Sequence, residues 1–183
     1  MTKKELILET ALNLFAQQGV GSTSTAQITK EAGVAEGTLF VHFKNKATLV
    51  DAIFMYIKQR EVKALLSVLD MEQRAEVNVK ALAKKMVEHF TENYNELIFV
   101  ESVKHLKLVS PTTVKKANES LAEIGNAFLM WQKKAQIKQT DMAILGSMTL
   151  SMMIALTHYC KQHNKKPTDI LVQPIWDALA PIN

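Results

Sequence analysis

The segment from Ile28 to Leu49, ITKEAGVAEGTLFVHFKNKATL, restricts the possible folds of this chain more than any other segment. Gly33 can adopt the positive φ angle that ends a helix, so the residues before it are expected to form one short helix. Val34 and Leu39 can bury against Ile28 if a second short helix follows the turn. The spacing therefore predicts a helix-turn-helix, with a further helix beginning near the end of the segment.

Polar residues support the boundaries of these helices. Ser24 and Gln27 have the spacing of a reciprocal capping box, in which each side chain bonds the backbone N–H of the other residue. Asn45 is expected to begin the later helix, so that Lys44 and Lys46 lie beside its free amides and the positive end of its dipole. This arrangement suits a phosphate group, but two lysines near a helix start are also typical of a solvated surface.

The start of the second short helix is predicted to be exposed, with Ala35, Glu36, Gly37 and Thr38 at its front. In helix-turn-helix proteins this part of the helix contacts base edges in the major groove. Glu36 can accept from a cytosine amino group, Thr38 can donate to a base or touch a thymine methyl, and Gly37 lets the backbone approach closely. In the alternative interpretation, Glu36 only stabilises the helix N-terminus and Thr38 only faces water.

Many positions within residues 3–49 match a single family pattern. The matching residues are Leu6, Ile7, Ala11, Leu14, Phe15, Gly19, Gly21, Thr25, Ile28, Ala32, Gly33, Val34, Gly37, Thr38, Leu39, Phe40, His42, Phe43, Lys44, Asn45 and Lys46. Together they resemble the DNA-binding domain of TetR-family transcriptional repressors, whereas the rest of the chain is similar to that family only in layout. The resemblance implies a regulator of transcription that binds double-stranded DNA.

The resemblance also implies roles for individual residues. Thr25 and Lys46 would contact phosphates, the residues around Gly37 would approach the bases, and His42 would reach the DNA backbone. The full expected DNA-binding set is Thr25, Ala35, Glu36, Gly37, Thr38, His42, Lys44 and Lys46. Phe40 stands where the family usually has a tyrosine whose hydroxyl bonds a phosphate. Because phenylalanine cannot donate this bond, the phosphate contact is in doubt here. Thr29 also replaces a usual alanine and Ala26 has no polar reach, so we expect fewer side-chain base contacts and modest sequence discrimination at each half-site.

Composition and periodicity extend the helical expectation to the whole chain. Only 6 Gly and 4 Pro occur in 183 residues, and no sustained apolar-polar alternation predicts a strand. The predicted fold is all-α, with a helix-turn-helix DNA-binding domain at 1–48, a connecting helix at 49–71 and a ligand-binding and dimerisation domain at 72–183. We expect the first helix at 2–18, the fourth at 45–69, and about five helices after them.

Residues 142–160 lack acidic or strongly basic side chains and are long enough to cross a membrane. The polar residues Ser147, Thr149 and His158 argue instead for a helix buried on both sides in a soluble protein. The resemblance implies that the last two long helices form the interface of a homodimer, here this helix together with 168–179. Two DNA-binding domains related by two-fold symmetry would then bind a palindromic operator.

The resemblance further implies that a small molecule binds among the C-terminal helices. The large apolar residues that could line its pocket are Met86, Phe90, Tyr94, Phe99, Phe128, Trp131, Met148 and Met152. Each of them could instead be an ordinary core residue. Their methionine and aromatic character favours an elongated or bulky hydrophobic effector.

The titratable residues form no recognised catalytic, phosphate-binding or metal motif. Glu101 and His105 are one helical turn apart, which is usually only a weak surface contact. Cys160 and His163 have a spacing that could hold a metal, but they lack the partner cluster that a structural zinc site needs. We therefore expect no enzymatic activity, no cofactor and no metal.

A single cysteine and an N-terminus with Lys3, Lys4 and Glu5 in place of an apolar export segment favour a cytoplasmic protein. The sequence as a whole predicts a ligand-responsive transcriptional regulator, in which a homodimeric repressor is released from DNA by its effector. The alternative is a helical interaction module, or a ligand-binding enzyme that retains a vestigial DNA-binding head.

Overall fold

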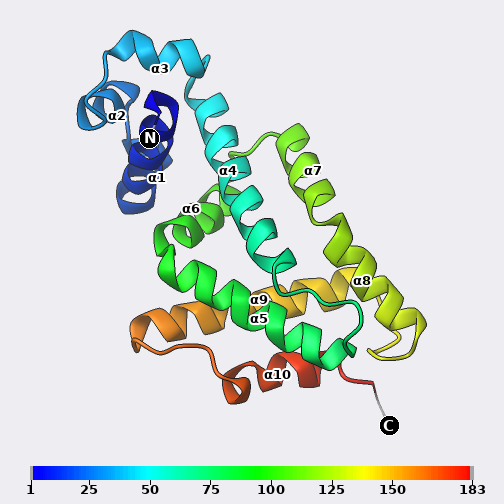
Figure 1. Ribbon diagram of the computed structural model, residues 1–183. Coiled ribbons are helices and arrows are strands. Elements are labelled where there is room, and N and C mark those ends of the chain that lie inside the picture. Colours follow the sequence, from blue (N-terminus) through cyan, green and yellow to red (C-terminus); the bar gives the residue numbers. More distant parts are fainter. Residues whose placement is uncertain (1, 182–183) are drawn as a thin grey trace. The chain divides into compact units, whose positions relative to one another are not determined.

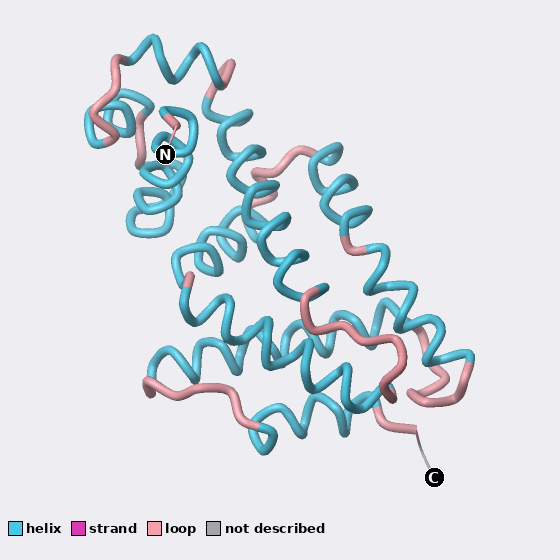
Figure 2. The backbone as a smooth tube through the Cα atoms, in the orientation of Figure 1, coloured by secondary structure: helices cyan, strands magenta, loops and turns pink. Residues whose placement is uncertain are grey.

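The computed structural model describes residues 2–181 and contains ten helices and no strand within that range (Figure 1). Loops and turns connect the helices, as the tube drawing shows (Figure 2). The helices are α1 Lys3–Ser22, α2 Thr25–Glu31, α3 Glu36–His42, α4 Lys46–Leu66, α5 Ala75–Glu92, α6 Tyr94–His105, α7 Pro111–Ser120, α8 Ala122–Lys133, α9 Met142–Gln162 and α10 Asp169–Leu179. The all-α fold expected from the sequence is confirmed.

Backbone contacts divide the chain into two compact units. The first unit contains the residues up to 59 together with 93–118, and the second contains 60–92 together with the residues from 119 onwards. Residues 93–118 therefore pack with the N-terminal helices, although the sequence suggested that they belong with the C-terminal ones. The functional division at residues 48 and 71 stays a prediction.

The first unit is built around α1, which contacts α2, α3 and α6. The ring of Phe15 on α1 stacks on Phe99 of α6, with 6.0 Å between the ring centroids. Both rings are buried, and such a pair stabilises a core beyond the area that it removes from water. The side chain of Asn95 on α6 also donates to Asn13 on α1 at 2.9 Å. This packing explains why α6 belongs to the first unit.

The first helix is interrupted where the sequence placed its end. Gly19 has a φ of +83°, and a short helical stretch then continues to Ser22. The interruption leaves carbonyl groups of α1 without their helical partners. The buried hydroxyl of Thr23 donates to the carbonyl of Gly19 at 2.9 Å and satisfies one of them.

The cap at Ser24 differs in part from the expected reciprocal box. The amide of Gln27 donates to the Ser24 hydroxyl at 3.1 Å, but the Gln27 side chain accepts from Gln18 at 2.9 Å. The reciprocal arrangement forms instead at Asn45 and Thr48, where each side chain accepts from the backbone N–H of the other residue at 2.9 and 3.1 Å. The start of α4 next to Asn45 is confirmed.

Later helix boundaries differ from the expected ones at two places. α4 ends at Leu66, earlier than the predicted 69. α7 and α8 are separate helices with a break at Leu121, so that six helices follow α4 in the described chain, and the expectation of about five was wrong. No glycine or proline marks this break, which is why the periodic pattern favoured a continuous helix.

In the second unit, α5 packs against both α9 and α10. The buried face of α9 repeats at helical spacing and consists of Leu145, Thr149, Met153, Thr157 and Cys160. On another face, Ile144 and Met148 are 56% and 50% exposed, so the expectation that this helix is buried on both sides was wrong for the single chain. Within residues 2–181, α9 is also the one helix long and apolar enough to cross a membrane, a test that core helices of soluble proteins also pass.

Asn78 holds the connection between α4 and α5. Its side-chain oxygen accepts from the backbone N–H of Asp70 at 2.9 Å, and its amide donates to the carbonyl of Asp70 at 2.8 Å. The same amide lies 3.3 Å from the carbonyls of Gln73 and Arg74. Asn78 is only 1% exposed, so it replaces water as the partner of these loop groups.

We expect Asn78→Ala to lower the free energy of unfolding by about 2 kcal/mol, because backbone groups of the loop lose their partners. Urea denaturation followed by circular dichroism measures this change. Val77→Ala is the matched control, since Val77 is the neighbouring residue and is 50% exposed. Equal effects of the two substitutions would show that the hydrogen bonds of Asn78 contribute nothing.

Candidate nucleic-acid interface and apolar groove

The turn between α2 and α3 depends on Gly33, as the sequence predicted. Gly33 has a φ of +65°, and its N–H donates to the carbonyl of Lys30 at 3.2 Å. The N–H of Val34 donates to the carbonyl of Thr29 at 3.0 Å, which satisfies a second carbonyl at the end of α2. Ala32 is buried just before the turn. This closed turn fixes where α3 begins relative to α2.

α3 is anchored on one face and exposed on the other. Leu39 within α3 and Phe43 at its end are 0% and 4% exposed, and α3 contacts both α1 and α2. At its start, Ala35, Glu36 and Gly37 are exposed, and Thr38 is half-buried. All four residues that were expected at the front of this helix therefore begin it, next to one another.

The later part of α3 also presents apolar side chains to solvent. Phe40 is 47% exposed, so its ring is not part of the hydrophobic core. Val41 is 81% exposed and lies one turn after Gly37, although the sequence analysis did not single it out. An apolar residue at an outward helical position was the signal that could have identified it. His42 is exposed at the end of α3.

The start of α4 presents backbone amides next to positive charge. The Asn45 side chain caps the amide of Thr48, while the first amides of any α-helix lack an intrahelical partner. Lys44 is exposed and Lys46 is half-buried at this end. Thr25 is half-buried at the first position of α2. These three side chains and the front of α3 all belong to the first unit.

The second unit contains an apolar groove of about 570 Å³. It is lined by Glu61, Leu65, Met86, Leu121, Ala122, Ile124, Gly125, Asn126, Phe128, Leu129, Met142, Ala143, Gly146, Thr149, Leu150 and Met153. These residues come from α4, α5, α8 and α9, together with the break between α7 and α8. Glu61 is the one ionisable residue of this lining, and it is only 3% exposed.

Only some of the residues expected at an effector site line this groove. Met86 and Phe128 do, whereas Trp131 is buried outside the lining and its ring packs edge-on against Phe128, with 5.0 Å between the ring centroids. Phe90 is a buried residue of α5, whereas Met148 is exposed and Met152 half-buried on α9. The remaining two, Tyr94 and Phe99, belong to the first unit. Sequence reasoning missed the residues around Leu121 because it did not predict the helix break there.

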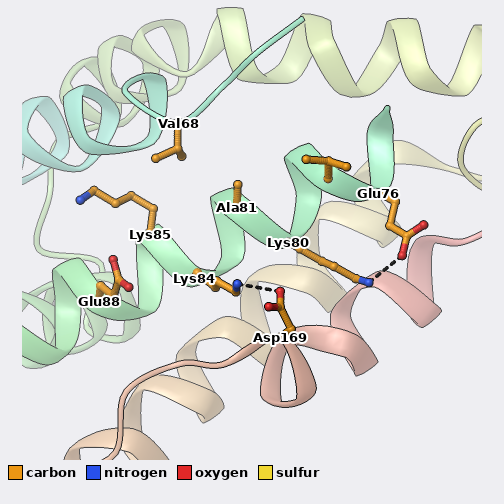
Figure 3. Close-up of a pocket in the computed structure, with 9 residues that line it drawn as sticks. Val68, Glu76, Lys80, Ala81, Lys84, Lys85, Glu88 and Asp169 are labelled. Carbon is orange, nitrogen blue, oxygen red and sulfur yellow. Dashed lines mark hydrogen bonds and ion pairs between the residues drawn. The ribbon is translucent and has the colours of Figure 1, made fainter. Parts of the chain in front are cut away.

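A second depression, of about 480 Å³, lies along α5 in the same unit (Figure 3). Lys84 donates to Asp169 at 2.6 Å, and Lys80 donates to Glu76 at the same distance. The hydrogen bond from Lys84 lowers the pKa of the Asp169 carboxyl, and the charge of Lys84 adds to this effect. Because cations and carboxylates are matched along this lining, it presents no single charge to a ligand.

The residues considered for metal binding lie apart from these features. Within residues 2–181, no group of three or more histidine, cysteine or acidic side chains could hold a metal ion. Cys160 is buried, and burial raises the pKa of its thiol. The ring of His163 packs against Tyr159 with 4.6 Å between centroids.

Comparisons with known proteins agree with the geometry of the first unit. The profile of the family described as bacterial regulatory proteins, tetR family, matches residues 7–53. The HTH-type transcriptional regulator AcrR of Shigella flexneri is 49% identical over 51 residues, which cover 28% of this chain and 24% of that protein. The matched segment spans about a quarter or less of the first curated relatives, between 19% and 24% of their length.

Two further relatives match over most of the chain. The uncharacterised HTH-type transcriptional regulator YhgD of Bacillus subtilis is 29% identical over 167 residues, covering 88% of this chain and 86% of that protein. The crystal structure of a proposed tetR family transcription regulator from Shewanella sp. PV-4 covers 100% of both chains, with 26% identity and a TM-score of 0.89. Together with the helix-turn-helix and the family profile, this likeness shows that residues 7–53 form a DNA-binding domain of the tetR family and that the chain as a whole has the fold of a solved protein described as a tetR family transcription regulator.

Proposed function

We propose that the protein is a cytoplasmic, homodimeric repressor that binds a palindromic operator and is released from it by a small hydrophobic effector. The outward face of α3 carries this proposal. Glu36 and Gly37 are exposed at its front, while Leu39 behind them is fully buried. A short helix held from behind and open in front can enter the major groove of DNA.

The chemistry of this face suits recognition of base edges. The Glu36 carboxylate can accept from a cytosine amino group, and the Thr38 hydroxyl can donate to a base. Val41 adds an exposed branched side chain that can pack on a thymine methyl group. At Gly37, the space that a side chain would occupy is open, so DNA can approach the backbone closely.

Phosphate contacts would hold this face against the groove. Lys44 and Lys46 lie at the start of α4, whose first amides and positive dipole end favour an anion. The net charge of the chain is only +4. Local placement of cations therefore has to supply the affinity that bulk charge does not.

The exposed apolar face of α9 supports the homodimer. Ile144 and Met148 are 56% and 50% exposed on α9, and Ile170 on α10 is 84% exposed. Large side chains of this kind cost free energy in water and become favourable when a second copy covers them. A two-fold pair would present two α3 helices to half-sites about one turn of DNA apart.

The groove of the second unit supports regulation by an effector. Glu61 and Leu65 in its lining belong to α4, the helix whose first residues carry the proposed phosphate contacts. A ligand that favours one position of α4 would change operator affinity, and the operator would change ligand affinity by the same factor. Effector release would thus act through a helix that both sites share.

We expect Lys46→Ala to weaken binding to all duplexes by a similar factor, because it removes a phosphate contact. The slope of log affinity against log salt should become shallower by about one contact. Fluorescence anisotropy with labelled operator at several salt concentrations measures both quantities. Lys133→Ala is the control, since Lys133 is exposed on α8 in the second unit. An unchanged slope would exclude the contact.

We expect Thr38→Ala to weaken binding to the operator by about 1 kcal/mol, or roughly fivefold, while binding to unrelated duplex changes little. Competition between operator and unrelated DNA measures this selective loss. Thr140→Ala serves as the control, because Thr140 is exposed between α8 and α9. A vestigial DNA-binding head predicts that neither Thr38→Ala nor Lys46→Ala has an effect.

We expect Met148→Glu to shift the protein from dimer to monomer, because it places a charge on the face that the partner would bury. Sedimentation equilibrium measures the dissociation constant of the dimer. Val77→Glu is a matched control, since Val77 is an equally exposed apolar residue on α5. If both variants remain as dimeric as the parent protein, this face of α9 is not the interface.

A further inference from the structure

We infer that a positively charged depression formed by α4 and α5 binds a diphosphate, either free or as part of a larger molecule. The depression has a volume of about 390 Å³ and is lined by Arg60, Lys63, Ala64, Ser67, Lys85 and His89. All of these residues belong to the second unit. The lining shares no residue with the apolar groove, so this site is separate from the one proposed for the effector.

The charge of this lining differs from that of the depression in Figure 3. Three basic side chains and an imidazole line it, and no carboxylate does. The carboxylates of the same segments line other cavities, since Glu61 lies in the apolar groove and Glu76 and Glu88 lie in the depression along α5. A concave surface with charges of a single sign attracts ions of the opposite sign. The depression is therefore suited to an anion.

The inference rests on the side chains of Lys63 and Lys85, which are exposed and half-buried, respectively. Neither forms an ion pair with a described residue, although Lys84, next to Lys85 on α5, is paired with Asp169. Figure 3 shows the Lys85 side chain directed away from this pair. Glu88 follows one turn later on α5, but no ion pair joins it to Lys85. Both lysines can therefore bind an anion without breaking a salt bridge.

The two lysines come from different helices, so α4 and α5 contribute like charges to one depression. An anion placed between them replaces this repulsion with two attractions. Lys63 also lies in the last turn of α4, where a cation balances the carbonyl groups of the helix end. Lys85 lies in the interior of α5, where no helix end accounts for its charge.

Linked phosphate groups suit this lining better than a single one. Lysine binds phosphate as a point charge, and cations on two helices can each meet one phosphate of a diphosphate. A volume of about 390 Å³ also exceeds the space that one phosphate group fills. Arg60 and His89 already interact with other residues of the chain, so they add donors to a site that the lysines define.

Inorganic pyrophosphate and sulfate test the preference of the site. We expect the intact protein to bind pyrophosphate at least tenfold more tightly than sulfate, in isothermal titration calorimetry at constant ionic strength without divalent cations. Lys63→Gln and Lys85→Gln should each weaken pyrophosphate binding at least fivefold, with the thermal midpoint of the parent protein. Lys133→Gln should leave the affinity unchanged, because Lys133 is an exposed lysine of α8 outside the lining.

Two variants of equal charge test the location of binding. Ser67→Glu places a carboxylate in the lining, whereas Thr140→Glu places one between α8 and α9, and both residues are exposed. We expect Ser67→Glu to lose at least tenfold in affinity for pyrophosphate and Thr140→Glu to stay within twofold of the parent protein. Equal losses would show that pyrophosphate responds only to net charge, which would overturn the assignment to this depression.

Adenosine diphosphate distinguishes the two sources of the diphosphate. Binding at least fivefold tighter than that of pyrophosphate, and lost in Ser67→Glu, would assign the site to a diphosphate within a larger molecule. Equal or weaker binding would assign it to a free diphosphate. Both results support a diphosphate in the depression, because pyrophosphate alone has to bind in either case.

The remaining outcomes separate this inference from the proposed function. Pyrophosphate binding no tighter than that of sulfate, an affinity that neither lysine variant changes, or no saturable binding would overturn the inference. Operator binding that depends on Thr38 and Lys46 would still support the proposed function in each of these cases. Conversely, diphosphate binding without any operator binding would refute the proposed function and leave the inferred site intact.

Discussion

A helix as short as α3, which spans Glu36–His42, cannot keep its conformation in water without tertiary support. The burial of Leu39 supplies that support, because it fixes the side of α3 that faces α1 and α2. The direction of every other side chain on α3 then follows from the helical period. The exposure of Glu36, Gly37 and Val41 is thus a consequence of where a single leucine is buried.

The surroundings of α3 limit how far it can move. Gly33 closes the turn before it, and the reciprocal cap at Asn45 and Thr48 fixes the beginning of the helix after it. α1 lies against α3 and is itself held by the packing of Phe15 on Phe99. The first unit therefore combines a rigid support with an outward face whose residues make few contacts within the chain. Such a surface can be specific without rearranging when DNA binds.

In the second unit, large apolar side chains are only partly buried within the single chain. α9 buries the face that carries Leu145 and Met153 and exposes the one that carries Met148. Although α9 is long and apolar enough to cross a membrane, it packs within the second unit through one face, and in the proposed homodimer a second copy would cover the other face. The groove leaves further apolar surface of the same unit uncovered.

The sequence by itself determined the features that depend on neighbouring residues. Gly33, Asn45 and the spacing of Ile28 and Leu39 specify the helix-turn-helix, because turns, caps and helical periods act over a few residues. The tertiary structure decided which distant segments meet. Phe99 and Met86 are similar apolar residues in sequence, yet one packs on Phe15 in the first unit and the other lines the groove of the second. The hydrophobic effect is non-directional and does not specify which residues pack together. Only the packing of the helices therefore determines that Phe99 lies in the core and Met86 lines the groove.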